Sequence, residues 1–112
     1  DAIRALCNTA DEDEVDTNKI EFNFNFFKSY TQGFFTEFKS ISEQEINLMP
    51  VSIKIVPFIM GLRFFTDYLN NNNYFKTKYQ NHNLDRAINQ FTFVKKITKQ
   101  SQQIETFLKT IK

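Results

Sequence analysis

Stretches with regularly spaced apolar residues are separated by polar stretches along this chain, a pattern that predicts helices joined by polar loops. Apolar residues recur every three or four positions over residues 26–39, 43–69 and 84–111, which predicts three amphipathic helices. A short helix is expected at residues 1–6. The acidic segment that follows, residues 8–18, has no apolar period and predicts a surface loop. We therefore expect a mainly α protein, with residues 1–112 forming a single helical unit.

Helix starts are predicted from residues whose side chains can accept the free amide hydrogens of a first turn. Asp1, Asn25 and Asn83 stand before apolar-periodic stretches and are expected to cap the helices there. Ser42 and Glu45 have the spacing of a capping box, which would open the stretch 43–69.

The two middle helices carry the most apolar side chains. Four aromatic residues of the first are expected to face the core as one stripe: Phe27, Tyr30, Phe34 and Phe38. In the stretch 43–69 we expect a break near Pro50 and a kink near Pro57, because proline lacks an amide hydrogen and crowds the preceding turn. This stretch is apolar on nearly every side, which implies burial within a larger assembly. Arg63, near its end, must then reach an anion, a carbonyl group or a polar cleft.

Charge and cysteine content narrow the function classes. Acidic residues outnumber basic ones seven to two in residues 1–21, and basic residues outnumber acidic ones six to two in residues 84–112. The basic residues are scattered around a helix without interleaved aromatic side chains, so no nucleic-acid partner is expected. The single cysteine, Cys7, is expected to be a buried apolar residue of a cytoplasmic protein. No apolar run approaches the ~20 residues of a membrane span, and no membrane association is expected.

Catalytic motifs are incomplete in this sequence. The only glycines, Gly33 and Gly61, are isolated within predicted helices, so there is no glycine-rich phosphate loop. His82, Asp85 and Asn89 superficially imitate the catalytic loop of kinases, but both intervals are wrong. The acidic loop lacks the glycine and the distal glutamate of a calcium loop. We expect no catalytic residue and no metal ligand in this chain.

Several blocks, taken in order, resemble a known enzyme family. They are DAIR at residues 1–4, NTA at 8–10, EDE at 12–14, GLRFFTDYL at 61–69, YFK at 74–76 and HNLDRAINQF at 82–91. This order is similar to that of the C-terminal half of bacterial N-acetylhexosamine 1-kinases, which belong to the aminoglycoside phosphotransferase and choline kinase-like group. The resemblance covers nearly the whole chain. It implies the C-terminal helical subdomain of a protein-kinase-like fold, and a fragment of the C-terminal lobe of a longer protein.

The resemblance also implies roles for individual residues. Arg63 and Tyr74 match the arginine and tyrosine that contact the sugar in that family. Asp1 resembles an aspartate that braces the catalytic loop, and His82 and Asp85 would orient a loop or be structural.

The cofactors and partners also follow from the resemblance. In the family, the nucleotide lobe, the catalytic loop and the magnesium site lie upstream of the matched region. ATP and Mg²⁺ are thus expected for the full-length protein and not for this fragment, which would be inactive alone. Its partners would be a small-molecule sugar and the missing N-terminal part of the same protein.

Alternative functions stay open at this point. The chain would otherwise be a stand-alone helical interaction module, or the same lobe of a kinase for an aminoglycoside, choline or homoserine. Some relatives have carried the label mucin desulfatase. Sulfatase chemistry is not supported, because Cys7 is followed by Asn8, Thr9 and Ala10 and not by the proline and arginine that the sulfatase nucleophile requires.

Overall fold

The computed structural model describes residues 1–111, and these form a helical protein. Its elements are α1 (Ala2–Leu6), the short 3-10 helix η1 (Thr17–Lys19), α2 (Phe24–Glu37), α3 (Glu43–Leu69), α4 (His82–Lys99) and α5 (Ser101–Lys109). The only extended pairing within this range is an isolated antiparallel bridge between Asn8 and Phe22. The expected mainly α class is therefore confirmed.

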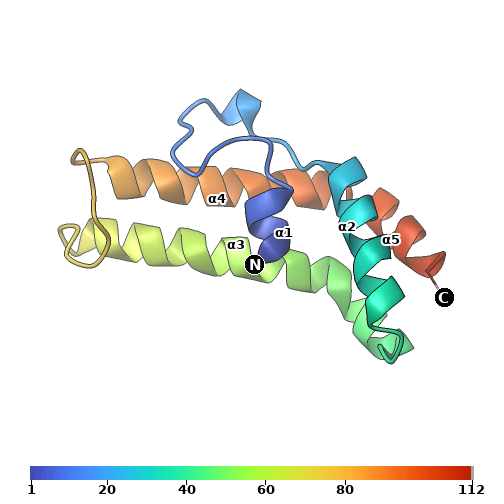
Figure 1. Ribbon diagram of the computed structural model, residues 1–112. Helices are drawn as coiled ribbons and strands as arrows, with labels where there is room; N and C mark the ends of the chain where they lie inside the picture. The colour runs from blue at the N-terminus through green and yellow to red at the C-terminus, as the bar shows by residue number, and fades with distance from the viewer. Residues whose placement is uncertain (112) are drawn as a thin grey trace.

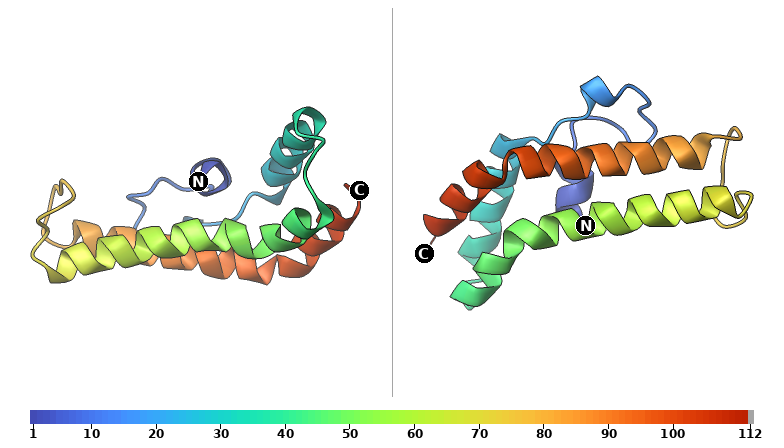
Figure 2. Two further views of the ribbon diagram at one scale, coloured as in Figure 1. Left: turned by 90° about the horizontal axis from the view of Figure 1, so that it is seen from below. Right: turned by 180° about the vertical axis from the view of Figure 1, so that it is seen from behind.

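The long helices α3 and α4 form an antiparallel hairpin (Figure 1). In Figure 2, α1, the acidic segment and α2 lie on one side of this hairpin, and α5 continues from α4 in a new direction. The described chain measures 47 × 26 × 20 Å, and its radius of gyration is 15.5 Å. A compact domain of this length would have a radius of gyration of about 13 Å. The molecule is therefore elongated, and the second layer covers only part of the hairpin.

The core lies where the second layer packs on α4 and α5. Its fully buried members include Cys7, Ile20, Phe27, Phe93, Ile97 and Ile104. The Phe22 ring lies 5.5 Å from that of Phe27 and 6.1 Å from that of Phe93. Such aromatic pairs contribute about 0.5–1.5 kcal/mol each beyond the burial of their area. Burial raises the pKa of the Cys7 thiol to about 11, so this residue packs as a small apolar side chain, as predicted.

Capping side chains set the first residues of α2 and α3. The Ser42 hydroxyl accepts from the Glu45 amide at 3.1 Å, and the Glu45 carboxylate accepts from the Ser42 amide at 3.2 Å, which confirms the capping box. For α2 the predicted cap, Asn25, was wrong. Asn23 caps this helix by accepting from the Phe26 amide at 3.0 Å, and the helix starts two residues earlier than expected.

The predicted core stripe of α2 was largely wrong. Of its four aromatic residues only Phe27 is buried, and the others are 38–56% exposed: Tyr30, Phe34 and Phe38. Thr31 and Phe35 are buried in their place. Because α2 meets its neighbours along one row of residues four apart, the adjacent row is left facing solvent.

Helix α3 runs without interruption from Glu43 to Leu69, so the break expected near Pro50 was wrong. The ribbon bends in its N-terminal half, the part that contains Pro50, and Pro57 follows just past the midpoint of the helix (Figure 1). A proline within a helix removes one hydrogen bond, and bending relieves its clash with the preceding turn. By length and composition α3 could also span a membrane, a test that core helices of soluble proteins pass too. The expected absence of a membrane span thus stays a prediction.

The single helix predicted over residues 84–111 is in fact two helices, α4 and α5. The first of them begins at His82, two residues earlier than expected. Gln100 separates α4 from α5, and its side-chain amide donates to the backbone oxygen of Phe22 at 3.0 Å. Asn83 is not the cap that we expected, because α4 already starts at His82 and Asn83 lies buried in its first turn.

The hairpin requires a glycine where α3 meets α4. A Cβ atom added to Gly61 would lie 2.6 Å from a ring carbon of Phe91, whereas one added to Gly33 would have no neighbour within 4 Å. We expect Gly61→Ala to lower the free energy of unfolding, since overpacking costs about 1–3 kcal/mol and the gain in helix propensity is about 1 kcal/mol. The matched control Gly33→Ala should raise it by roughly 0.5–1 kcal/mol. Urea denaturation followed by circular dichroism measures both, and equal stability of the two variants would contradict this packing.

Candidate functional site

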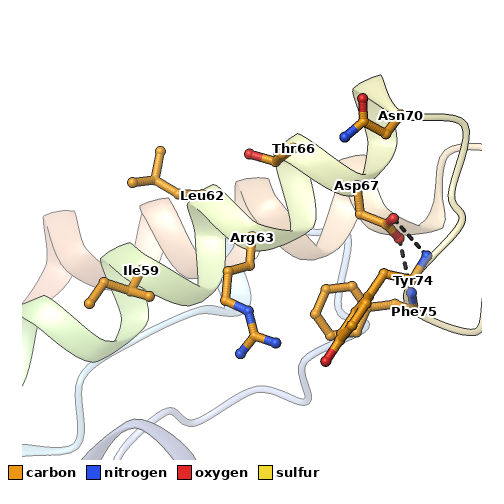
Figure 3. A pocket seen from close by; sticks show the side chains of 8 residues that line it. All are labelled: Ile59, Leu62, Arg63, Thr66, Asp67, Asn70, Tyr74 and Phe75. Atoms are coloured by element: carbon orange, nitrogen blue, oxygen red, sulfur yellow. Dashed lines mark hydrogen bonds between the residues drawn. The ribbon is translucent and has the colours of Figure 1, made fainter.

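One buried carboxylate, that of Asp67 near the end of α3, anchors the loop between α3 and α4. Asp67 is 5% exposed. It accepts from the backbone amides of Tyr74 and Phe75 at 2.8 and 3.0 Å, as Figure 3 shows, and from the Asn83 side chain at 2.8 Å. Burial acts to raise the pKa of this carboxyl, but the amides of Phe75 and Tyr74 and the Asn83 side chain outweigh it and hold the pKa below its ordinary value. Asp67 is therefore charged and ties both ends of the loop together.

Asparagines complete the chain reversal within this loop. Asn71 and Asn72 have positive φ angles of 64° and 58°, a conformation that asparagine tolerates better than most residues. The Asn72 side-chain oxygen also accepts from the Asn83 side chain at 3.1 Å. The run of asparagines, residues 70–73, thus begins the loop that joins α3 to α4.

A hollow of about 440 Å³ opens between the last turns of α3 and this loop (Figure 3). It is lined by Ile59, Leu62, Arg63, Thr66, Asp67, Asn70, Tyr74 and Phe75. The guanidinium carbon of Arg63 lies 5.7 Å from the centre of the Tyr74 ring and 5.4 Å from that of Phe75. Tyr74 is 75% exposed. The two residues predicted to bind substrate, Arg63 and Tyr74, therefore border the same hollow.

The charge of Arg63 is not paired with a carboxylate in residues 1–111. One guanidinium nitrogen lies 3.6 Å from the Met60 sulfur, and the group otherwise packs against the two aromatic rings. Because Arg63 is exposed, its charge stays hydrated and needs no buried anion. Its remaining donors are available to a ligand in the hollow.

His82 lies outside the hollow and is almost fully buried, with 1% exposure. Its Nε2 atom lies 2.7 Å from a carboxylate oxygen of Asp13, and its Nδ1 atom accepts from the Lys78 amide at 3.1 Å. The ring also stacks on Tyr79 at 4.7 Å. These contacts make His82 part of the scaffold that holds the loop and the acidic segment on α4.

Arg86 and Asn89 lie on the same face of α4 as His82 and hold the same segment, residues 8–18. Arg86 donates to the Asp13 carboxylate at 3.3 Å, and Asn89 donates to two backbone oxygens of the segment at 2.9 and 3.1 Å. The His82 hydrogen bond, helped by Arg86, holds the pKa of Asp13 below its ordinary value although burial opposes this. The predicted surface loop is thus held against α4 by the side chains of His82, Arg86 and Asn89.

The other two site candidates also lie away from the hollow. Asp85 is in the first turn of α4, as expected, and accepts from the Tyr79 hydroxyl at 2.7 Å, which raises the pKa of that tyrosine. Asp1 is exposed and pairs with Arg4 at 2.8 Å. Asp1 is the N-cap residue of α1, as expected, but its carboxylate forms no hydrogen bond to an amide of the first turn.

Two residues that matter at this joint, Asp67 and Asp13, had no assigned role in the sequence, and Asn83 was assigned a different one, that of a helix cap. A signal for Asp67 exists, because a carboxylate within the apolar run FFTDYL must find hydrogen bonds when the run is buried. No comparable signal exists for Asp13, which is one of several acids in its segment.

Neither a metal-binding cluster in the described residues nor a matching protein family for the chain was found. Within residues 1–111, no group of three or more His, Cys, Asp and Glu side chains could hold a metal ion. No model of a known protein family matches the chain.

We expect Asp67→Asn to destabilise the protein, because the amide group cannot accept two backbone hydrogens as a charged carboxylate does. The folded-state pKa is lowered from 3.8, so the stabilisation is complete above about pH 4 and disappears as the pH falls through the folded value. The difference in melting temperature between wild type and variant should therefore be largest near neutral pH and shrink in acid. Asp11→Asn, which removes an exposed carboxylate, is the control. A pH-independent difference would contradict the assignment.

The ring of His82 should carry its proton on Nε2. Its Nδ1 atom accepts the Lys78 amide hydrogen, so the proton shared with Asp13 belongs to Nε2. His82 is the only histidine, which makes its ¹⁵N signals unambiguous in a long-range ¹H–¹⁵N spectrum at neutral pH. Detection of the Nδ1–H tautomer would contradict this hydrogen-bond pattern.

Proposed function

We propose that this chain forms the sugar-binding side of an ATP- and Mg²⁺-dependent N-acetylhexosamine 1-kinase. The observation that carries the proposal is the shared hollow: Arg63 and Tyr74, eleven residues apart in sequence, border it together. These are the two residues that the resemblance to such kinases assigned to the sugar. In this proposal the chain positions the acceptor, and catalysis comes from another part of the protein.

The chemistry of the hollow suits a monosaccharide. Its volume of about 440 Å³ is within the range of small-molecule sites. The Tyr74 ring offers a flat apolar face to a pyranose ring, while Arg63 and Asn70 offer hydrogen-bond donors to hydroxyl groups. Ile59 and Leu62 provide an apolar wall for an acetamido methyl group.

The charge of the hollow favours a neutral acceptor. Arg63 brings a positive charge, and the carboxylate of Asp67 is already engaged by two backbone amides and by Asn83. A cationic acceptor such as choline or an aminoglycoside would meet an unpaired positive charge without a free carboxylate. A neutral sugar would not.

Nucleotide and metal are assigned elsewhere in this proposal. Residues 1–111 contain no group of three or more His, Cys, Asp and Glu side chains that could hold a metal ion, and the proposal places Mg²⁺ in another part of the protein. Phosphoryl transfer depends on positioning the acceptor as well as on the metal and the base. The contribution of Arg63 and Tyr74 would be to orient the anomeric hydroxyl.

A stand-alone interaction module is the second candidate function. It is favoured by one observation, the large apolar side chains that α3 exposes to solvent, several of them about half exposed. Such a surface is typical of a docking face.

The kinase proposal is tested with the full-length protein that contains this chain. We expect ATP-dependent formation of ADP with N-acetylglucosamine or N-acetylgalactosamine, and a roughly 10–100-fold lower kcat/KM in Arg63→Ala, the loss expected for a hydrogen bond from a charged group. Lys95→Ala, an exposed basic residue of α4 away from the hollow, should retain activity. Unchanged activity in Arg63→Ala would remove Arg63 from the site, and no ADP formation with either sugar would refute the function.

A further inference from the structure

One face of α3 carries a regular apolar repeat that the rest of residues 1–111 leaves largely exposed, although at its edge the Phe58 ring lies 5.9 Å from that of Phe91 on α4. Its exposed large side chains are spaced alternately three and four residues apart over three heptads: Leu48, Val51, Ile55, Phe58, Leu62, Phe65 and Leu69. Each is between 38% and 63% exposed. We call this row the α3 seam. A strict alternation of this kind has a period of 3.5 residues, which is the repeat of a helix that packs along a second helix.

The seam is separate from the face that α3 already uses. The side chains buried against the rest of the molecule include Ile46, Ile53, Pro57 and Phe64. With 100° between successive residues, the centre of the seam lies about 150° around the helix from this buried row. Figure 2 shows α1 and α2 together on one side of the hairpin, so they do not close over both faces of α3. The helix is thus apolar on two nearly opposite faces, of which one is packed and the other is largely exposed.

The area of the seam matches what a stable interface needs. The seven side chains of the seam and Ile59 beside it are each about half exposed. Together they offer on the order of 700 Å² of accessible surface. Each partner in a standard interface contributes ~800 Å², which is close to this area. Isolated exposed apolar residues are ordinary, but a continuous row of this size is not.

The charges beside the seam indicate what kind of helix would pack there. In paired helices the flanking positions select the partner, and rows of like charge prevent a helix from pairing with itself. Among the positions that flank the α3 seam only Lys54 is charged, and its neighbours Ser52, Ile59 and Thr66 are uncharged. A second copy of the same helix therefore meets no row of like charges. It also supplies an apolar row with the same repeat.

We infer that the α3 seam is a self-association surface, on which α3 of a second copy of this chain packs in a two-fold symmetric dimer. Symmetric pairing of identical patches is the commonest way in which soluble proteins form oligomers. Because Ile59 and Leu62 also border the hollow, the second copy would lie beside its apolar wall. The inference rests on the spacing and exposure of the seam and does not depend on the proposed function.

The test compares two substitutions of the same residue type. Ile55 lies in the seam and is 46% exposed, and Ile88 lies on α4 outside the seam and is 43% exposed. Sedimentation equilibrium of the wild-type chain at about 100 µM should give twice the mass of one chain, since interfaces of this size have dissociation constants from micromolar to picomolar. Ile55→Glu should weaken dimerisation at least about thirtyfold, the effect of a central interface residue, and Ile88→Glu should not.

Circular dichroism of Ile55→Glu separates loss of the interface from loss of the fold. A monomeric variant that retains the helix content of the wild type has lost only the interface. Ile55→Ala, a milder change, should weaken the dimer in the same direction. A wild-type monomer at this concentration would overturn the inference, and so would equal effects of Ile55→Glu and Ile88→Glu. A monomer that binds phosphatidylcholine vesicles through the seam would identify lipid as the occupant and would equally overturn it.

Discussion

The carboxylate of Asp67 is the contact on which the joint between α3 and α4 depends. A carboxylate in a residue that is 5% exposed needs hydrogen-bond donors in place of the water that it has lost. Asp67 obtains them from two successive backbone amides of the loop and from a side chain of α4. This requirement brings Tyr74 back beside Arg63 and sets the hairpin in register. The hollow, and any function it has, follows from that closure.

Basic residues of α4 form ion pairs with acidic residues from the first part of the chain. Part of the charge of the acidic first part and of the basic last part is paired within the fold, where Asp13 pairs with Arg86 and Glu21 pairs with Lys96. Exposed ion pairs of this kind contribute about 0–1 kcal/mol each. Their main effect, together with the buried contacts of His82 and Asn89, is to hold an irregular segment in one place.

The two apolar faces of α3 account for the shape of the molecule. One face packs on α4, where Gly61 allows the Phe91 ring to approach, and the opposite face is exposed. A helix that is apolar all round is expected to be buried on all sides. The elongated chain thus has the core of a domain at one end of the hairpin and an uncovered apolar helix along its length. This combination connects the proposed active-site wall with the inferred dimer surface, since both use α3.

The sequence by itself determined the mainly helical class, the capping box of Ser42 and Glu45 and the burial of Cys7, because these depend on local hydrogen bonds or on simple apolar character. It also singled out Arg63 and Tyr74, whose assignment to a sugar stays a prediction. Only the tertiary structure decided which aromatic row of α2 is buried, where the last helix divides, and that His82 and Asp13 hold each other. These outcomes depend on contacts between residues far apart in the chain, such as Gln100 with Phe22, and no local pattern records such a contact.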